Sequence, residues 1–273
     1  MAKKAAATKK KAPKNEVSME TKTTVKTVTV SGKQSFGKHL EGALSSRTLW
    51  RALAAEVIGT FLLASVILAS QGSPSFVLCG LAGIVLLLGA VSGAHVNPAI
   101  TLAAWATRRI SLFRTVGYIF AQFLGASLAF FVFSAFIGGA TQPTAEQQMY
   151  GQSAASLFKA ADIANLGGKE WYVFFSELLG TAVLGFGVAV ALKAKDALHA
   201  AFSAGFGIFL GLMIAITTAG YVSATTIMNP AVALSLQAYS TSTWSYVAYA
   251  LGPVIGGVLG FLIHDLVRGK KTA

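Results

Sequence analysis

Cysteine and acidic residues are scarce in this chain, and their scarcity excludes several classes of protein. The one cysteine, Cys79, cannot form an internal disulfide or a thiolate metal cluster, and we interpret it as a small buried residue. Only ten residues are acidic and four are histidine. The chain shows no Ser/His/Asp set, no phosphate-binding loop and no metal-ligand spacing. The sequence therefore indicates no enzyme, and neither a cofactor nor a metal is expected.

Basic residues outnumber acidic ones and give a net charge of +12, but half of them lie in one segment. Residues 1–48 carry ten Lys and Arg47. This segment has too little apolar surface to offset the entropy of ordering it, and it lacks the apolar core of a signal peptide. We expect a solvated cytoplasmic tail, with loose contact to anionic lipid as the alternative. Nucleic-acid binding is disfavoured, because Phe36 alone does not make a set of interleaved aromatic side chains for base stacking.

Long apolar runs dominate the rest of the chain. Over its whole length the chain is 54% hydrophobic, with a mean hydropathy of +0.64. Most of the runs have the roughly 17 to 25 residues that a membrane-spanning helix needs. There are six, at 49–70, 75–91, 112–136, 171–192, 199–219 and 244–267. We therefore predict an all-α membrane domain over 49–268, followed by a short tail at 269–273.

The positions of Lys and Arg predict the orientation in the membrane. If the N-terminal tail is inside, only Lys159 and Lys169 of the 22 basic residues fall outside, both in the connection 137–170. Cytoplasmic connections carry the excess of positive charge, and an even number of spans returns the chain to the same side. We expect a multi-pass protein of the plasma (inner) membrane with both termini in the cytoplasm.

Two tripeptides, Asn97-Pro98-Ala99 and Asn229-Pro230-Ala231, interrupt the apolar pattern. Asn is a good N-cap and Pro suits the first helical position, so each tripeptide predicts the start of a helix, continued by 100–107 and 232–239. About ten residues make a helix of roughly 15 Å, half of a bilayer core of about 30 Å. Non-helical backbone at that depth must be buried in protein or line a watery cavity. The pair therefore predicts two half-spanning helices at a pore.

An internal repeat connects these features. Residues 55–61 and 176–182 share the pattern Glu-x-x-Gly-Thr, and each opens a half that later reaches its own Asn-Pro-Ala. Three spans per half is an odd number, so the second half is inverted relative to the first. The two half-helices then meet tip to tip. Asn97 and Asn229 would each cap a helix through the side-chain oxygen and leave the amide NH2 free to donate into the pore, while the helix dipoles repel cations.

Three further polar residues lie where the pore is expected. Glu56 and Glu177 are the only acids well inside apolar runs. We interpret them as buried carboxyls that accept hydrogen bonds from the backbone of the half-helix loops, with a proton relay as the alternative. His95 either lines the cytoplasmic half of the pore or is a satisfied structural histidine. The other histidines, His39, His199 and His264, are isolated.

At these residues the sequence resembles the aquaporin and glycerol-facilitator family, the major intrinsic proteins. The resemblance rests on residues 92–101, on the second Asn-Pro-Ala, on the two Glu-x-x-Gly-Thr segments and on 118–122, and covers about 50–268. It implies six spans with two re-entrant half-helices in an inverted repeat, a homotetramer with one pore per subunit, and passive flux of water and small neutral solutes such as glycerol, urea or ammonia through the lipid bilayer.

The chain departs from the family pattern at the outer constriction. In most of the family an Arg directly follows the second Asn-Pro-Ala, and here that position is Val232. By their spacing from the two Asn residues, the other constriction positions are Val77, Thr217 and Thr226. Losing the guanidinium removes a fixed charge and up to five donors, so the opening should be wider and more apolar. An apolar constriction can also lose its water, so the alternative is a structural or adhesion membrane protein with an occluded pore. A secondary transporter is disfavoured, because the buried acids occupy loop-bracing positions.

Overall fold

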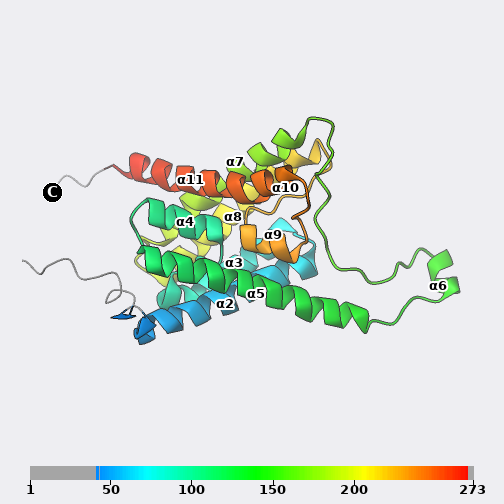
Figure 1. Ribbon diagram of the computed structural model, residues 1–273, viewed down its shortest axis with the longest axis horizontal. Coiled ribbons are helices and arrows are strands. Elements are labelled where there is room, and N and C mark those ends of the chain that lie inside the picture. The colour runs from blue at the N-terminus through cyan, green and yellow to red at the C-terminus, as the bar shows by residue number, and fades with distance from the viewer. Residues whose placement is uncertain (1–40, 43, 270–273) are drawn as a thin grey trace, which may run out of the picture.

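The structure of this chain is a computed structural model that describes residues 41–42 and 44–269, and it is a bundle of helices without a strand in those residues (Figure 1). Six apolar helices of 19–27 residues, with mean hydropathy between 1.9 and 2.3, are long enough to cross a bilayer. They are α2 (Arg47–Ser70), α3 (Pro74–Ser92), α5 (Leu112–Gly138), α7 (Glu170–Ala191), α8 (Ala197–Gly220) and a last span at Thr243–Arg268. The predicted fold class and spans are confirmed.

The span boundaries follow from local capping. The first helix begins at Arg47 instead of 49, because Ser46 accepts a hydrogen bond from the Leu49 backbone N–H at 3.3 Å. The predicted tail is therefore two residues shorter where it meets the bundle. Its residues 1–40, and 270–273 of the C-terminal tail, lie outside the described residues. We call the end of the bundle with the starts of α2 and α5 and the α7–α8 connection the inner end, and the opposite end the outer end.

Two short helices complete the bundle. They are α4 (Pro98–Ala106) and α9 (Pro230–Ser235), of nine and six residues. Each begins at the Pro of its tripeptide, as predicted, and α9 stops earlier than expected because Gln237 adopts a left-handed φ of 53°. In Figure 1 α4 and α9 lie one beyond the other along the bundle, beside α5.

The last span is broken, which its continuous apolar run did not predict. It consists of α10 (Thr243–Tyr246), the π-helix η1 (Val247–Leu251) and α11 (Gly252–Arg268). Pro253 lacks the N–H that an α-helix would donate to the Tyr249 carbonyl, and the extra residue of the π turn absorbs this defect. Tyr249 is fully buried, and its hydroxyl donates to the Thr225 carbonyl at 2.9 Å. The break thus anchors the loop that precedes α9.

The inverted repeat is visible in equivalent contacts of the two halves. Gly125 of α5 packs against the backbone of α2 at the carbonyl of Val57 and the N–H of Phe61. Gly256 of α11 packs in the same way against α7, at the Leu178 carbonyl and the Ala182 N–H. Those backbone groups belong to the residues one and five positions after Glu56 in α2 and after Glu177 in α7. The two halves therefore use one packing scheme, in which a glycine lets the helix backbones touch.

The connection between α5 and α7 covers part of the outer end. It carries the short helix α6 (Ala145–Met149), which projects away from the bundle in Figure 1. It then returns to the bundle, where Ala160 N–H donates to the Leu236 carbonyl and Ala161 N–H donates to Thr225 Oγ1, both at 2.9 Å. This return segment fixes the ends of the second re-entrant loop.

The glycine contacts generate a test of the packing scheme. A methyl group on Gly260 of α11 would collide with the Ala182 carbonyl of α7, whereas a methyl group on Gly83 of α3 would meet no atom within 4 Å. We expect Gly260→Ala to lower the stability by about 1–3 kcal/mol through overpacking. The matched Gly83→Ala should be neutral or slightly stabilising, because alanine favours the helix. Thermal unfolding in detergent measures both, and equal melting temperatures would contradict the scheme.

Candidate functional site

The two helix tips meet at the centre of the bundle, and each is capped by its own asparagine. Asn97 Oδ1 accepts from the Ala99 N–H at 2.9 Å. Asn229 Oδ1 accepts from the N–H groups of Ala231 and Val232 at 3.0 and 3.3 Å. Pro98 and Pro230 occupy the first helical position of α4 and α9, where no N–H is needed. Local sequence therefore explains how each tip forms.

The tips are joined by a reciprocal pair of hydrogen bonds. Asn97 Nδ2 donates to the Met228 carbonyl at 2.8 Å, and Asn229 Nδ2 donates to the Val96 carbonyl at 2.9 Å. Each bond connects residues more than 130 positions apart. The prediction that both amide NH2 groups are wholly free is therefore wrong in part. One N–H of each amide crosses to the other loop, which leaves one N–H of each for a further acceptor.

The residue before each asparagine packs against a long helix and so positions the helix tip. Val96 and Met228 have left-handed φ values of 45° and 56°, and both side chains are buried. A methyl group on Gly59 would lie 2.6 Å from Val96 Cγ1, and one on Gly180 would collide with Met228 Sδ. Each glycine thus leaves the space that one of these side chains fills. Sequence reasoning missed this role, although the repeat contained the signal, since both glycines stand three positions after a Glu.

The buried carboxylates hold the backbone of the two re-entrant loops. Glu177 accepts from the N–H groups of Ile227 and Met228 at 2.5 and 2.6 Å. Glu56 accepts from His95 and Val96 at 3.0 and 2.7 Å. Both glutamates are 0% exposed. The left-handed residues turn these N–H groups away from any helix, so the carboxylates supply the acceptors that the loops lack.

The first loop has additional side-chain support. Glu56 also accepts from Ser92 Oγ at 2.6 Å and from Gln122 Nε2 at 2.8 Å. The Tyr118 hydroxyl donates to the Ser92 carbonyl at 2.7 Å, which fixes the start of the loop. Within the described residues, the Glu177 carboxylate accepts from these two backbone donors alone, and the neighbouring Thr225 is instead held by Tyr249 and Ala161. The two halves therefore reach the same loop geometry with different partners.

His95 lies on the inner side of the first tip. Its side chain is 4% exposed, its Nδ1 is 3.3 Å from Thr101 Oγ1, and its ring packs edge-on against Tyr118. Beside the loop, a cavity of about 330 Å³ opens between α3, α7 and α8, and Gly93 and Ala94 contribute to its wall. The inner end of the bundle thus has a cavity that reaches the backbone next to His95.

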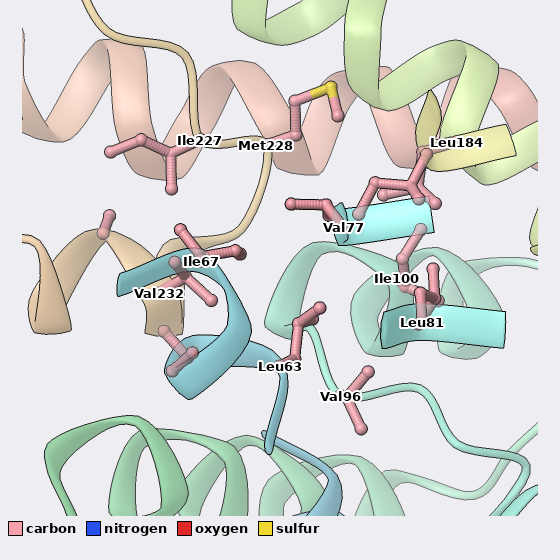
Figure 2. Close-up of a cluster of buried hydrophobic side chains, with 14 of the residues drawn as sticks. Leu63, Ile67, Val77, Leu81, Val96, Ile100, Leu184, Ile227, Met228 and Val232 are labelled. Carbon is pink, nitrogen blue, oxygen red and sulfur yellow. The ribbon is translucent and has the colours of Figure 1, made fainter. Parts of the chain in front are cut away.

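The expected constriction residues are only partly brought together. Val77 of α3 and Val232 of α9 are 1% and 0% exposed and belong to one buried apolar cluster with Ile67 of α2 (Figure 2). Thr226 is half-buried, and its Oγ1 has no hydrogen-bond partner in the described part of the chain. Thr226 therefore places, six residues before Val232, a hydroxyl that no other described group of the protein bonds.

Thr217 is the exception, and its assignment to the constriction is wrong. It lies on the exposed face of α8 together with Leu210 and Met213, which precede it by seven and four positions. Thr218, one residue later, is half-buried and stands three positions after the buried Ala215. The prediction used the family's spacing between this position and the second Asn, and assumed that the loop before Asn229 contains no insertion or deletion. A one-residue difference rotates a helical side chain by about 100°.

The sequence analysis did not identify two leucines near the tips. Leu63 and Leu184 are each 2% exposed, belong to the same apolar cluster, and stand seven positions after Glu56 and Glu177 (Figure 2). Their equal offset in the repeat was the available signal. Within the described ranges, no group of three or more His, Cys, Asp or Glu side chains could hold a metal ion.

Comparisons with known proteins agree with this geometry. A family model described as "Major intrinsic protein" matches residues 43–264. Aquaporin AqpM of Methanothermobacter marburgensis is 31% identical over 204 residues, which are 70% of this chain and 74% of that protein. The lens fiber major intrinsic protein of Lithobates pipiens is 30% identical over 233 residues, 81% of this chain and 82% of that one. A crystal structure of the aquaglyceroporin from Plasmodium falciparum shares the fold, with a TM-score of 0.57 at 21% identity, over 81% of this chain and 97% of that one.

The carboxylate contacts generate a prediction for Glu177→Gln. The amide would place an NH2 group against one of the two backbone N–H donors, at Ile227 or Met228, so one charge-assisted hydrogen bond is lost inside the protein. Such a loss costs about 1.5–3 kcal/mol, and we expect a lower melting temperature in detergent. Glu146→Gln on the exposed helix α6 is the matched control and should melt like the parent protein. Equal melting of both variants would show that the carboxylate does not hold the loop.

Proposed function

Since this chain belongs to the major intrinsic protein family, whose members are channels and not enzymes, we propose that it is a passive channel for water and small uncharged solutes. The solutes belong to the class of glycerol, urea and ammonia. The observation that carries the proposal is the meeting of two asparagine-capped helix tips at the bundle centre. The names of the relatives, aquaporin and aquaglyceroporin, support the same class of solute.

The tips supply the polar groups of the proposed pathway. One N–H of Asn97 and one of Asn229 are not used by the cross-bonds, and each can donate to a solute oxygen. The N-termini of α4 and α9 add partial positive charge at the same place. A neutral solute that accepts hydrogen bonds is favoured there, whereas a cation or a hydronium ion is repelled. His95 lines the inner half of the pathway in this proposal.

The constriction proposed at the outer end is apolar. We assign Val77, Thr226 and Val232 to it and replace Thr217 by Thr218. No Lys or Arg occurs between residues 196 and 267, so neither α8, nor α9, nor the last span before its final residue Arg268 offers a Lys or Arg side chain for a charged wall. The two threonine hydroxyls then provide the hydrogen bonds that a solute exchanges for water. A wall of this kind selects by size more than by hydrogen bonding.

We further propose a homotetramer with one pathway per subunit, with both termini in the cytoplasm of a plasma (inner) membrane. Large exposed apolar side chains on the long helices support a position in lipid or between subunits, among them Phe76, Leu87, Phe131, Phe202 and Leu210. The distribution of Lys and Arg supports the orientation. The basic residues 1–48 would lie near the inner lipid surface and contact anionic headgroups.

One observation favours the alternative of a non-conducting protein with the same fold. Leu63, Ile67, Val77 and Val232 are at most 7% exposed and form one apolar cluster at the outer side of the tips. An apolar constriction can exclude water when its side chains fill the opening. In that case the chain would act as a structural or adhesion protein.

Solute flux distinguishes the two functions. We expect proteoliposomes that contain the full chain to shrink faster than empty vesicles in an osmotic gradient, measured by stopped-flow light scattering for water, glycerol and urea. Vesicles with an unrelated membrane protein control for leakage. Permeability no higher than in these vesicles, for every solute, would overturn the channel function and leave the occluded alternative.

Substitutions at Val232 test the size argument. Val232→Arg places a long guanidinium in a fully buried site at the start of α9, so we expect it to reduce glycerol and urea flux more than water flux. Val232→Ala removes two methyl groups and should raise the flux of the larger solutes. The ratio of glycerol to water permeability in proteoliposomes is the measurement. A ratio that is the same in both variants would show that Val232 does not border the pathway.

A further inference from the structure

A second cavity lies at the inner end of the bundle. Its Lys and Arg side chains take no part in the contacts described above. It has a volume of about 390 Å³ and lies between the first re-entrant loop, the start of α5 and the α7–α8 connection. No acidic side chain lines it; its lining is Ser92, Gly93, His95, Arg109, Ile110, Arg114, Leu192 and Lys193. We propose that this cavity binds a phosphate-type oxyanion.

Arg114 is the basic residue of the cavity without a counter-charge. Its guanidinium lies 5.6 Å from the centre of the Tyr118 ring, and no carboxylate in the described ranges pairs with it. It stands in the first turn of α5, which contains no acidic residue. A cation at the positive end of a helix is unfavourable. A bound oxyanion would compensate both the guanidinium and the helix end.

The other two cations of the lining share one carboxylate. Arg109 Nη2 and Lys193 Nζ lie 2.6 and 3.0 Å from the same oxygen of Asp265. Two permanent cations thus face one acid, and with Arg114 these four side chains keep an excess of two positive charges, of which the Glu56 carboxylate behind Ser92 and His95 offsets one. The guanidinium and the ammonium also retain N–H donors that Asp265 does not use.

His95 adds a neutral donor from a buried position. Thr101 Oγ1 accepts from Gln122 Nε2 at 2.8 Å and lies 3.3 Å from His95 Nδ1; in the tautomer that the proposal uses, Oγ1 donates to Nδ1 and the imidazole proton is on Nε2. In the described part of the protein Nε2 has no hydrogen-bond partner. A methyl group on Gly93, another lining residue, would be 3.6 Å from Nε2. The Nε2 donor of a side chain that is 4% exposed therefore faces the cavity.

The basic side chains are accessible from two directions. A neighbouring cavity of about 400 Å³ shares Arg109, Ile110 and Arg114, and its remaining wall is formed by the starts of α2 and α5. The first cavity reaches the first re-entrant loop, and the second lies between the starts of α2 and α5, the ends of two spanning helices, where lipid headgroups are expected. The same oxyanion chemistry can therefore be supplied by free phosphate or by the phosphate of an anionic lipid.

The test measures binding to the full-length protein in a non-ionic detergent. We expect inorganic phosphate to raise the melting temperature saturably above that in chloride at equal ionic strength, because a ligand of the folded state stabilises it. Arg114→Gln should weaken the apparent affinity by about tenfold or more, and Arg114→Lys should restore part of it. Lys193→Gln, on a side chain that is 38% exposed, should also weaken binding. Arg108→Gln is the matched control, since Arg108 is exposed and lines neither cavity.

Lipid composition then distinguishes the two sources. In nanodiscs of phosphatidylcholine with added phosphatidylglycerol, a headgroup site predicts a raised melting temperature and no further response to phosphate. A site for free anions predicts the same phosphate response with and without phosphatidylglycerol. Equal effects of phosphate and chloride, or equal responses of Arg114→Gln and Arg108→Gln, would overturn the proposal. Because the measurement is binding, its result is independent of whether the chain conducts solutes.

Discussion

The reciprocal hydrogen bonds between the two asparagine tips are the constraint on which the rest of the structure depends. Halfway through a bilayer the lipid offers no partner to a free N–H or C=O group, so two broken helices are tolerated only if their ends find partners in the protein or line a water-filled cavity. Asn97 and Asn229 cap their own helices and bond the opposite loop at 2.8 and 2.9 Å. Each tip is therefore complete only when the other is present.

The long helices are built to receive these tips. In each half a Glu supplies acceptors for the loop N–H groups, and a Gly three positions later makes room for the residue before the Asn. One turn of α2 and one turn of α7 thus perform both tasks. The inverted repeat preserves this unit, whereas the partners around it differ, with Gln122 and Tyr118 on one side and Tyr249 on the other.

Charge is distributed unevenly along the axis of the bundle. The centre combines helix N-termini and amide donors with buried carboxylates whose oxygens accept from the loops. The outer side of the tips is apolar around Val77 and Val232, and the inner end is basic around Arg109, Arg114 and Lys193. The two proposals therefore place neutral molecules and anions at different parts of the bundle, the neutral molecules along the pathway at its centre and the anions at its inner end.

The sequence was enough to predict the six spans, the start of both half-helices and the inverted repeat, because hydropathy and Asn-Pro capping are local properties and the inversion follows from the odd number of spans in each half. It also indicated the loop-bracing environment of Glu56 and Glu177. The packing of distant segments was needed to show that Thr217 faces outward, that one N–H of each Asn crosses to the other loop, and that a π turn precedes Pro253. Helix phase, cross-loop bonds and a cavity shared by three connections depend on how segments far apart in the chain pack together, and local sequence patterns do not show that packing.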